Sequence, residues 1–577
     1  MPSPLDTANA LLDQGKVDQA QAVALRALAG NPNHAGLLAL LGFIAFASND
    51  LPRCEHYSRQ VLRLHPRDPR VNANLGSVLV SQARFEEALP LLTTAVEAAP
   101  ADDVARAGLA SALTGLSRYS EARRVLEEGL ARTPRSPYLR HALPNLLHAT
   151  GRIEQALPLM RELVAEPGAT PTQLQRYAVM HTYAPGTSPA QLLAAHQRYA
   201  RALDPAPAPR PPLPRAAPNP LRLAFISPDL RRHSVAHVVE PIFDHLDRAR
   251  FHLTCYATST SADEVTARLR AKSDQWRSCA TLADSKIADL IRADRIDILI
   301  DLAALTQGGR PGVLSHRPAP FTISYAGYPS TTGLPGMDFR MVDALTDPAG
   351  SEAHSAERLL RLDPCSTTYR PPESPPPVSP LPALGAGHIT FASFSSPLKF
   401  NEPLIRLWSR LLTAIPRSRL ILKHFSLADE GVRADLRERF YSAGAPPDSV
   451  EPLAPVEAVG GHLAVYHRAD IALDTFPYHG TLTTLESLLM GLPVVSLIGG
   501  TTASRMGLSL LSAAGLPDLC VTTEDDYIAK AATLAADLDS LSTLRASLRP
   551  RLLASPLCDG RAFTERFQTL LLSLYSG

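Results

Sequence analysis

The chain has 577 residues, a length that fits three or four domains. Its 57 Lys and Arg residues nearly balance its 56 Asp and Glu residues, so the net charge of +1 offers no basic surplus for nucleic acid or an anionic membrane surface. The six cysteines are scattered without metal-ligand spacing, which is typical of reduced thiols in the cytosol. We find no signal-peptide pattern and no apolar run of the roughly 20 residues that a spanning helix needs. We therefore expect a cytoplasmic protein that binds neither nucleic acid nor a membrane.

The first third of the chain repeats with a period of 34 residues. Prolines and small residues both keep this interval: Pro32, Pro66, Pro100 and Pro134, and Ala20, Cys54, Ala88, Ala122 and Ala156. A small residue where two helices cross closely, and a proline after the second helix, are the signature of tetratricopeptide repeats (TPR). One helix pair cannot bury its own apolar face, so about five units are predicted to stack into a superhelix between residues 5 and 170. Residues 1–204 are expected to form this region, with a helical cap at 171–203.

Such solenoids commonly bind peptides or proteins along a concave face. A structural stalk or a dimer surface is the alternative, and a homo-oligomer is compatible with either. We favour polypeptide binding because the solenoid precedes a pattern typical of an enzyme.

Two proline-rich linkers, residues 205–220 and 364–387, are predicted to separate the remaining domains. Residues 221–363 and 388–577 each alternate apolar strand-like runs with helical stretches, and the second of these ranges includes C-terminal helices. This pattern predicts two doubly wound α/β units with parallel sheets, whose ligands bind at the carboxyl ends of the strands. The clearest predicted strands are residues 221–227, 251–257, 296–302, 321–325, 339–342, 388–394 and 419–423.

A glycine and several threonines stand where a predicted strand, residues 471–475, meets a predicted helix, residues 482–490. They are Gly480, Thr481, Thr483 and Thr484. Backbone N–H groups and hydroxyls at a helix start suit a phosphate, because that end of the helix carries partial positive charge. Glu486, one turn into the helix, could accept hydrogen bonds from the two hydroxyls of a ribose. The alternative is an ordinary strand-to-helix loop with a threonine N-cap.

Three further motifs accompany this junction: residues 225–237, residues 316–320 running on to 325–333, and residues 394–399. Together with the repeats, they make nearly the whole chain resemble the O-linked N-acetylglucosamine transferase family, including its SPINDLY-type plant relatives. The resemblance implies an α-helical TPR superhelix followed by an α/β GT-B glycosyltransferase with two Rossmann-like domains. The insert between catalytic halves of animal members is absent here, as expected of a compact bacterial form.

The resemblance also implies roles for individual residues. His233 would be an active-site histidine, acting as general base or as a hydrogen-bond donor, and His237 would face the same cleft. Lys399 would lie against the diphosphate, where a fixed cation stabilises the leaving group without a metal. No Asp-x-Asp metal motif follows a predicted strand, so we expect neither a metal nor a cofactor.

Further positions are carried over from the family in the same way. Gly327, Tyr328 and Pro329 would form a loop that contacts the sugar, with Gln307 and Arg310 in a nearby segment of the cleft. These five residues are expected to line the sugar and acceptor side of the site.

His462 would lie near the base, on the nucleotide side of the site. Thr481 stands where animal members have histidine, as it does in SPINDLY-like sequences. It therefore leaves the donor sugar open.

The expected activity is inverting, metal-independent transfer of N-acetylglucosamine from UDP-N-acetylglucosamine (UDP-GlcNAc) to Ser or Thr of polypeptides held along the solenoid. One alternative keeps the fold and changes the donor to GDP-fucose, as in the SPINDLY branch. Another is a TPR scaffold whose transferase domain is degenerate.

Overall fold

The computed structural model divides into two compact units. The first contains Met1–Thr150 and Phe425–Ala434, and the second contains Gly151–His424 and Asp435–Gly577. Much of the predicted linker at 205–220 lies outside the described residues, as do the two C-terminal residues. The structure describes residues 2–48, 50–204, 208–209, 211–212, 217–454 and 461–575.

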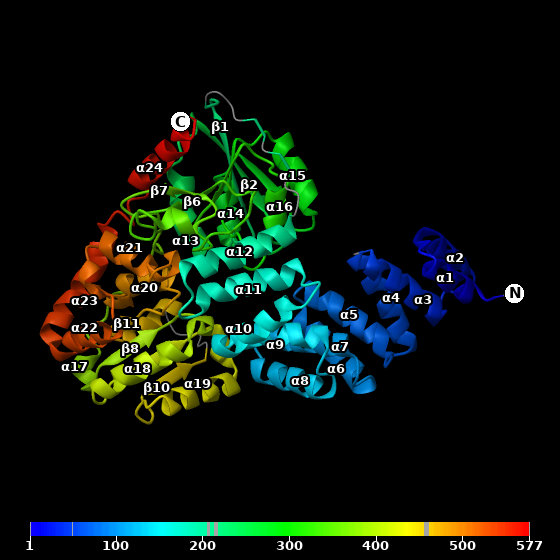
Figure 1. The fold of residues 1–577 in the computed structure, drawn as a ribbon, viewed down its shortest axis with the longest axis horizontal. Helices are drawn as coiled ribbons and strands as arrows, with labels where there is room; N and C mark the ends of the chain where they lie inside the picture. The colour runs from blue at the N-terminus through cyan, green and yellow to red at the C-terminus, as the bar shows by residue number, and fades with distance from the viewer. Residues whose placement is uncertain are drawn as a thin grey trace. The chain divides into compact units, whose positions relative to one another are not determined.

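The solenoid unit is built from antiparallel helix pairs, and the first helices of neighbouring pairs also pack against each other (Figure 1). Its helices are α1 Pro4–Asp13, α2 Val17–Gly30, α3 Ala35–Ala47, α4 Leu51–Leu64, α5 Pro69–Ser81, α6 Phe85–Ala98, α7 Asp103–Gly115, α8 Tyr119–Arg132 and α9 Pro137–Ala149. Helices α2, α4, α6 and α8 each end two residues before the repeated proline. The repeated small residues Ala20, Cys54, Ala88 and Ala122 are fully buried. Both residue series therefore have the structural roles predicted for a TPR array.

A third series with the same period escaped the sequence analysis. It consists of the N-cap residues of the first helices, whose side chains each accept a hydrogen bond from the backbone N–H three residues on: His34, Asp68, Asp102, Ser136 and Thr170. These caps satisfy donors that a helix start would otherwise leave unpaired. The series continues into the predicted cap, which is a further helix pair, α11 Pro171–Tyr183 and α12 Pro189–Leu203. With α10 Ile153–Ala165, these helices belong to the second unit and not to the solenoid unit.

A segment from the second half of the chain completes the solenoid unit. The backbone N–H of Ser120 donates to the Asp429 carboxylate at 2.8 Å, and a Cβ on Gly431 would lie 2.1 Å from the Ser120 hydroxyl. The segment therefore packs closely on α8.

The second unit contains two parallel sheets that share the same order over six strands, and the first sheet adds a seventh strand at one edge. The first runs β3-β2-β1-β4-β5-β6-β7, and the second runs β10-β9-β8-β11-β12-β13. In both sheets the chain starts in the middle, builds outward on one side, and then crosses to the other. The carboxyl ends of β1 and β4, and of β8 and β11, are therefore the switch points at which doubly wound folds bind ligands.

The elements of the first half are β1 Leu221–Ser227, α13 Ser234–His245, β2 Phe251–Ala257, α14 Glu264–Ala271, β3 Gln275–Ser278, α15 Asp284–Ala293, β4 Ile298–Asp301, α16 Pro311–Ser315, β5 Phe321–Ser324, β6 Phe339–Val342, η1 Ser351–His354 and β7 Arg358–Arg361. Those of the second half begin with α17 Ala383–Ala386, β8 Thr390–Ser393, η2 Pro397–Lys399, α18 Glu402–Ala414, β9 Arg419–Lys423, η3 Phe425–Ala428, α19 Glu430–Ser442 and β10 Val450–Leu453. They continue with η4 His462–Arg468, β11 Ile471–Leu473, α20 Leu482–Leu489, β12 Val494–Leu497, η5 Thr502–Ser504, α21 Met506–Ala513, η6 Pro517–Leu519, β13 Cys520–Val521, α22 Glu524–Ala536, α23 Leu538–Leu553 and α24 Gly560–Ser573.

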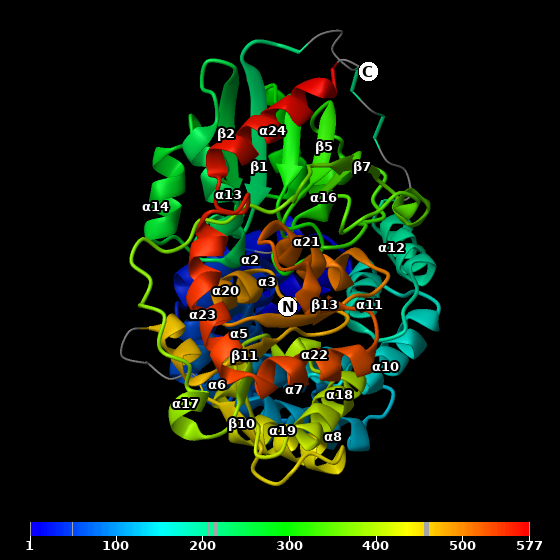
Figure 2. The same cartoon turned by 90° about the vertical axis from the view of Figure 1, so that its left-hand side faces the viewer.

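The last helix departs from the predicted domain boundary. Helix α24 packs against α13, and Figure 2 shows it lying along the first sheet. Its residues Phe563, Phe567 and Leu571 are fully buried in the core of the first half. The assignment of 388–577 to one C-terminal domain is therefore wrong for α24, which returns to complete the first half.

The proline-rich stretch 364–387 is packed and is not a simple linker. The Tyr369 N–H donates to the Leu557 carbonyl at 2.7 Å. Farther along, the buried Arg545 guanidinium donates to the Ser379 carbonyl at 2.9 Å and to its hydroxyl at 3.0 Å. These bonds hold the crossover between the halves onto α23 and the loop that follows it.

Candidate active site

Lys399 lies just after β8, at the switch point of the second sheet, and its ammonium group is tightly held. It donates to the His479 carbonyl at 2.8 Å, and it lies 4.5 Å from the centre of the Tyr478 ring. Burial lowers the pKa of Lys399 to about 8, while the nearby Asp474 carboxylate favours the charged form. A partly buried cation at this point suits an anionic ligand that it can meet without a large cost of desolvation.

The loop between β11 and α20 is organised by Asp474. One carboxylate oxygen accepts from the backbone N–H groups of Thr475 and Gly480, at 2.9 and 2.8 Å, and the other accepts from the Ser496 hydroxyl at 2.7 Å. A Cβ on Gly480 would lie 2.1 Å from the Thr483 hydroxyl, so the backbone and this hydroxyl approach each other as only glycine permits.

Thr481 occupies the N-cap position of α20, yet its side chain makes no capping hydrogen bond. The alternative reading is therefore met in the position of Thr481 but not in a side-chain cap, and phosphate binding at this junction stays a prediction. Thr484 donates its hydroxyl back to the Gly480 carbonyl at 3.3 Å. The first N–H groups of α20 therefore point out of the helix start. They lie close to the His479 carbonyl, which accepts the hydrogen bond from Lys399.

Glu486 is the centre of a hydrogen-bonded chain on the same side of the second half. Its carboxylate accepts from the Tyr466 hydroxyl and from His462 Nε2, each at 2.9 Å. His462 Nδ1 in turn accepts from the Lys423 ammonium at 2.6 Å, so the neutral ring carries its proton on Nε2. Burial lowers the pKa of Lys423, and the Glu486 carboxylate opposes that shift. The structure thus brings together the two residues predicted for the ribose and the base.

His233 lies after β1, at the switch point of the first sheet, as the N-cap of α13. Its Nδ1 accepts from the Val235 N–H at 3.3 Å and lies 3.7 Å from an Asp229 oxygen. Burial lowers the pKa of His233 and raises that of Asp229. With Nδ1 accepting, the neutral imidazole carries its proton on Nε2 and presents a donor there.

His237 makes hydrogen bonds to the segment of chain that crosses between the halves. Its Nδ1–H donates to the Arg370 carbonyl at 3.1 Å, and its own carbonyl accepts from the Arg370 N–H at 2.9 Å. His237 therefore joins α13 to the crossover, and its predicted place in the cleft stays a prediction.

The loop after β5 has an additional role that the sequence did not indicate. A Cβ on Gly327 would lie 1.9 Å from the Leu302 carbonyl, which explains the glycine. The Tyr328 hydroxyl donates to His196 Nε2 at 2.6 Å and lies 3.2 Å from the Thr182 hydroxyl. Tyr328 thus anchors the loop to α11 and α12, and its own pKa is raised by burial.

Tyr328 and Pro329 nevertheless line a cavity between the two halves, together with Thr481. This places part of the predicted sugar loop and the start of α20 around one space. Its other polar lining side chains come from both halves: Ser324, Tyr325, Arg340, Thr346, Ser366, Thr367 and Thr502.

Gln307 and Arg310 lie after β4, also at the first switch point. Gln307 is exposed. Arg310 forms an ion pair with Asp284 at 2.5 Å and donates to the Leu282 carbonyl at 2.6 Å. The Arg310 charge is therefore used within the first half, and a contact of either residue with substrate stays a prediction.

Three residues of the site region escaped the sequence analysis. Asp474 and His479 organise the loop that is predicted to bind phosphate, and Tyr478 lies beneath the Lys399 ammonium. They belong to residues 474–479, which precede the predicted Gly480 and to which the sequence analysis gave no role beyond a strand end and a loop. The aromatic residue next to the histidine and glycine was the available signal.

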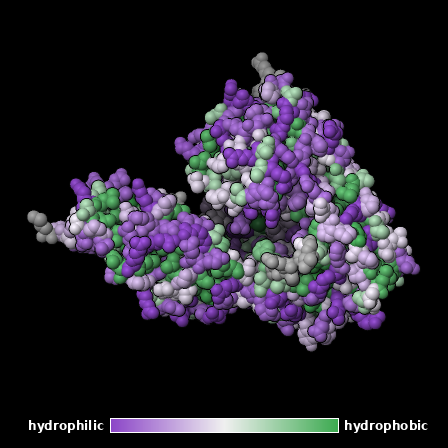
Figure 3. All heavy atoms as spheres, turned by 180° about the vertical axis from the view of Figure 1, so that it is seen from behind, coloured by the Kyte–Doolittle hydropathy of each residue, from purple (hydrophilic) through white to green (hydrophobic). Residues whose placement is uncertain are grey.

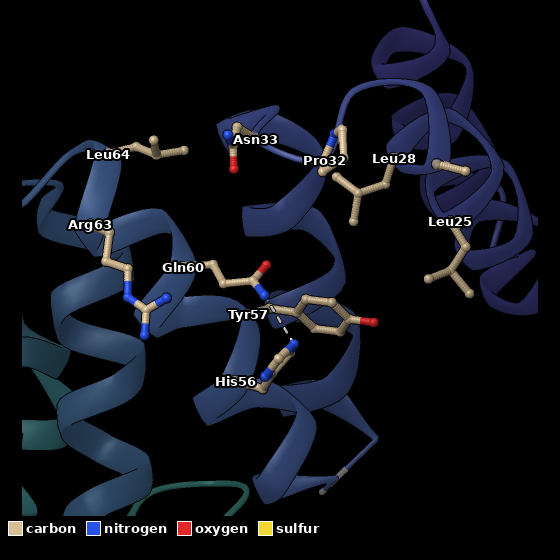
Figure 4. Close-up of a pocket in the computed structure, with 10 residues that line it drawn as sticks. Leu25, Leu28, Pro32, Asn33, His56, Tyr57, Gln60, Arg63 and Leu64 are labelled. Carbon is tan, nitrogen blue, oxygen red and sulfur yellow. Dashed lines mark hydrogen bonds between the residues drawn. The ribbon is translucent and has the colours of Figure 1, made fainter.

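The solenoid carries a separate groove of about 510 Å³ between α2 and α4. Leu25 and Leu28 form one wall, while Tyr57 and the hydrogen-bonded pair His56 and Gln60 form the other (Figure 4). Hydrophilic and hydrophobic residues alternate over the solenoid face shown in Figure 3. The groove lies on the second helices of the first two helix pairs and on the loop that follows α2.

Within the part of the chain that the structure describes, no helix is both long and apolar enough to cross a membrane. In the same residues, no three His, Cys, Asp or Glu side chains form a group suited to a metal ion. Metal independence and the lack of a cofactor stay predictions.

A family model described as glycosyl transferase family 41 matches residues 211–365 and 382–567, which is more than half of the chain. The chain belongs to glycosyl transferase family 41. Models of tetratricopeptide repeats match residues 5–53, 44–103 and 79–146 of this family 41 member, which confirms the predicted solenoid.

Relatives of the family 41 chain include a tomato (Solanum lycopersicum) protein named "Probable UDP-N-acetylglucosamine--peptide N-acetylglucosaminyltransferase SPINDLY". It is 37% identical over 62% of this chain and 39% of its own length. An Arabidopsis thaliana relative named SEC is 28% identical over 62% of this chain and 37% of its own length. A Caenorhabditis elegans peptide N-acetylglucosaminyltransferase is 23% identical over 61% and 40%. The matched region thus spans about 40% of the length of these relatives.

A solved structure also matches most of the chain. A mutant of the O-GlcNAc transferase of Thermobaculum terrenum aligns with a TM-score of 0.81 and 29% identity, covering 88% of this chain and 98% of that one. The match confirms the predicted architecture of helical repeats followed by two Rossmann-like halves.

Proposed function

We propose that this family 41 member transfers N-acetylglucosamine from UDP-GlcNAc to Ser or Thr hydroxyls of polypeptides, with inversion and without a metal. The observation that carries the proposal is the Lys399 ammonium, held on the His479 carbonyl next to the start of α20. Lys399 and the unpaired N–H groups of α20 together suit a diphosphate. The names of the relatives support the donor and the class of acceptor.

In the proposed reaction the acceptor hydroxyl attacks the anomeric carbon from the face opposite the diphosphate. The new C–O bond forms as the bond from the sugar to the diphosphate breaks, and UDP leaves with the electron pair. Lys399 stabilises the charge that develops on the leaving diphosphate. Glu486 holds the ribose, with His462 beside the base.

His233 acts in this scheme as a donor and orienting group. Its Nδ1 accepts a hydrogen bond from the Val235 N–H, so Nε2–H can donate a hydrogen bond to an oxygen of the nucleotide sugar or of the acceptor hydroxyl. The proton lost by the acceptor hydroxyl then passes to a phosphate oxygen of the donor or to water. A general base at His233 would instead require the ring to turn Nδ1–H toward Asp229.

Transfer from GDP-fucose is the second candidate. The SPINDLY relatives are 36–37% identical to this chain, against 28% for SEC and 23% for the nematode enzyme. Thr481 lines the cavity between the halves and stands where animal members of the family carry histidine. Thr481 is the observation that favours GDP-fucose, because the printed names of the SPINDLY relatives themselves give UDP-N-acetylglucosamine.

Calorimetric titration with UDP, GDP and their sugar conjugates decides between the candidates. Tight binding of UDP and UDP-GlcNAc, with sugar incorporated into a polypeptide, supports the first. Preference for GDP and GDP-fucose supports the second, and Thr481→His should then weaken it. If no nucleotide binds, the transferase domain is a scaffold and both proposals fall.

A further inference from the structure

The Lys399 side chain is fixed by an aromatic stack that reaches out of the nucleotide half. The Tyr478 ring lies 4.5 Å from the Lys399 ammonium, a distance suited to a cation–π interaction. Tyr183, the last residue of α11, stacks on Tyr478 with ring centres 4.5 Å apart and planes 12° apart. Lysine, Tyr478 and Tyr183 thus form one continuous column.

The Tyr478 end of this column has a defined backbone. The Thr475 hydroxyl donates to the Tyr478 carbonyl at 2.6 Å, and the Asn401 amide donates to the Phe476 carbonyl at 2.6 Å. The next residue, His479, accepts from Lys399 through its carbonyl and is itself fully buried. Its ring donates to the Leu497 carbonyl at 2.8 Å and accepts from the Gly507 N–H at 3.0 Å. The loop is therefore fixed on both sides of Tyr478.

The Tyr183 end is fixed by the first half. Thr182, its neighbour on α11, lies 3.2 Å from the Tyr328 hydroxyl, and His196 on α12 accepts from that hydroxyl at 2.6 Å. A Cβ on Gly333 would lie 2.5 Å from the His196 backbone, so the loop after β5 packs directly on α12. The end of α11 therefore contacts the sugar loop of one half and the phosphate loop of the other.

We propose that Tyr478 and Tyr183 are positioning residues for the reaction, and that the helix pair α11–α12 is part of the catalytic machinery. Tyr478 positions the Lys399 ammonium at the proposed diphosphate site next to the start of α20, and Tyr183 holds the Tyr478 ring in place by stacking on it. This inference rests on the proposed function, because it assumes that Lys399 meets the donor diphosphate.

The charged state of Lys399 gives the column a measurable signature. The charged or titratable groups facing Lys399 are Asp474, His479, His424 and Tyr478. Burial lowers the pKa of both histidines, that of His424 to about 4, and burial raises the pKa of Tyr478 well above 10. Lys399 is therefore the member of this group that changes its charge near pH 8.

The experiment measures kcat and KM against pH for the full chain and its Tyr478→Leu, Tyr478→Phe, Tyr183→Leu and Tyr183→Phe variants. Loss of the ring removes a contact that favours the ammonium form. In Tyr478→Leu we therefore expect kcat to fall and the basic limb to move about 0.5–1 pH unit lower. Tyr183→Leu should shift the limb in the same direction by less. Each phenylalanine variant keeps the ring but loses the hydrogen bond between the two tyrosine hydroxyls, so it should shift the limb less than the matching leucine variant. Tyr441→Leu, an exposed tyrosine on α19, is the control.

An unmoved basic limb in a folded Tyr478→Leu, or equal losses in Tyr478→Phe and Tyr478→Leu, would overturn the inference. Should Tyr478→Leu fail to fold, Tyr183→Leu decides by the same criterion. A Lys399→Ala variant with parent activity would instead refute the proposed function. The two failures are therefore distinguishable.

Discussion

Lys399 combines two properties that are usually opposed: it is a cation, and it is partly buried. Desolvation lowers its pKa to about 8, and it keeps its proton at neutral pH with help from Asp474 and the His479 carbonyl. A cation with few waters to shed can interact strongly with charge that develops on a leaving group. The predictions at this scale test that balance.

Activity should depend on the Lys399 ammonium. Below its pKa of about 8 the lysine is charged and active, and above it the charge is lost, so kcat/KM should fall as pH rises through about 8. Lys399→Ala should lower kcat by about 10²–10³-fold and abolish this basic limb, as a pH series of initial rates would show. The exposed Lys286→Ala is the control. A basic limb that persists in Lys399→Ala would assign the titration to another group.

His233 should act through hydrogen-bond donation. Glutamine retains an N–H donor but cannot take up a proton, so His233→Gln should keep at least about tenfold more activity than His233→Ala. Single-turnover rates at saturating donor would compare them. Equal losses in the two variants would favour a general base at this position.

At the scale of elements, the contacts of α12 depend on a glycine with left-handed backbone. Gly333 has φ of +71°, and a side chain there would strike the His196 backbone. Gly333→Ala should lower the free energy of unfolding of the second unit by about 1–3 kcal/mol more than Gly350→Ala does. Gly350 is a matched control, since its φ is +96° and no atom lies within 4 Å of its added Cβ. Chemical denaturation would measure the stability of both variants. Equal effects would show that α12 shifts at little cost to accommodate the added methyl group.

The sequence predicted the central elements well and the sheet edges poorly. The central strands are buried on both faces and read as apolar runs. The strands that were missed, β3, β7, β10 and β13, are the two edges of each sheet, and they carry polar residues or are very short. Edge strands need only one neighbour and one covered face, so hydrophobicity does not mark them.

The site was predicted in the same uneven way. Lys399, Gly480, Glu486 and His462 lie at strand ends and at a helix start of the second half, features that can be read locally, and their binding of a nucleotide stays a prediction. The contacts of Tyr328 with His196, and of Tyr183 with Tyr478, join segments more than 130 residues apart. No local pattern in one sequence records such a pair.

At the scale of the whole molecule, the first half depends on a helix from the far end of the chain. Phe567 is fully buried in its core. Phe567→Ala should destabilise the catalytic unit by about 3–5 kcal/mol and lower activity at elevated temperature, whereas the exposed Glu565→Ala on the same helix should not. Denaturant midpoints would show the difference. Equal midpoints would mean that α24 contributes little.

The return of α24 has a consequence for how the protein is made. A ribosome that has finished β7 must still add roughly 200 residues before it supplies the helix that covers α13, which takes about 10–40 s at typical elongation rates. During that interval the nascent first half exposes the apolar surface that later receives Phe563, Phe567 and Leu571. The two halves thus cannot mature one after the other on the ribosome, and a chain released early should be a substrate for chaperones.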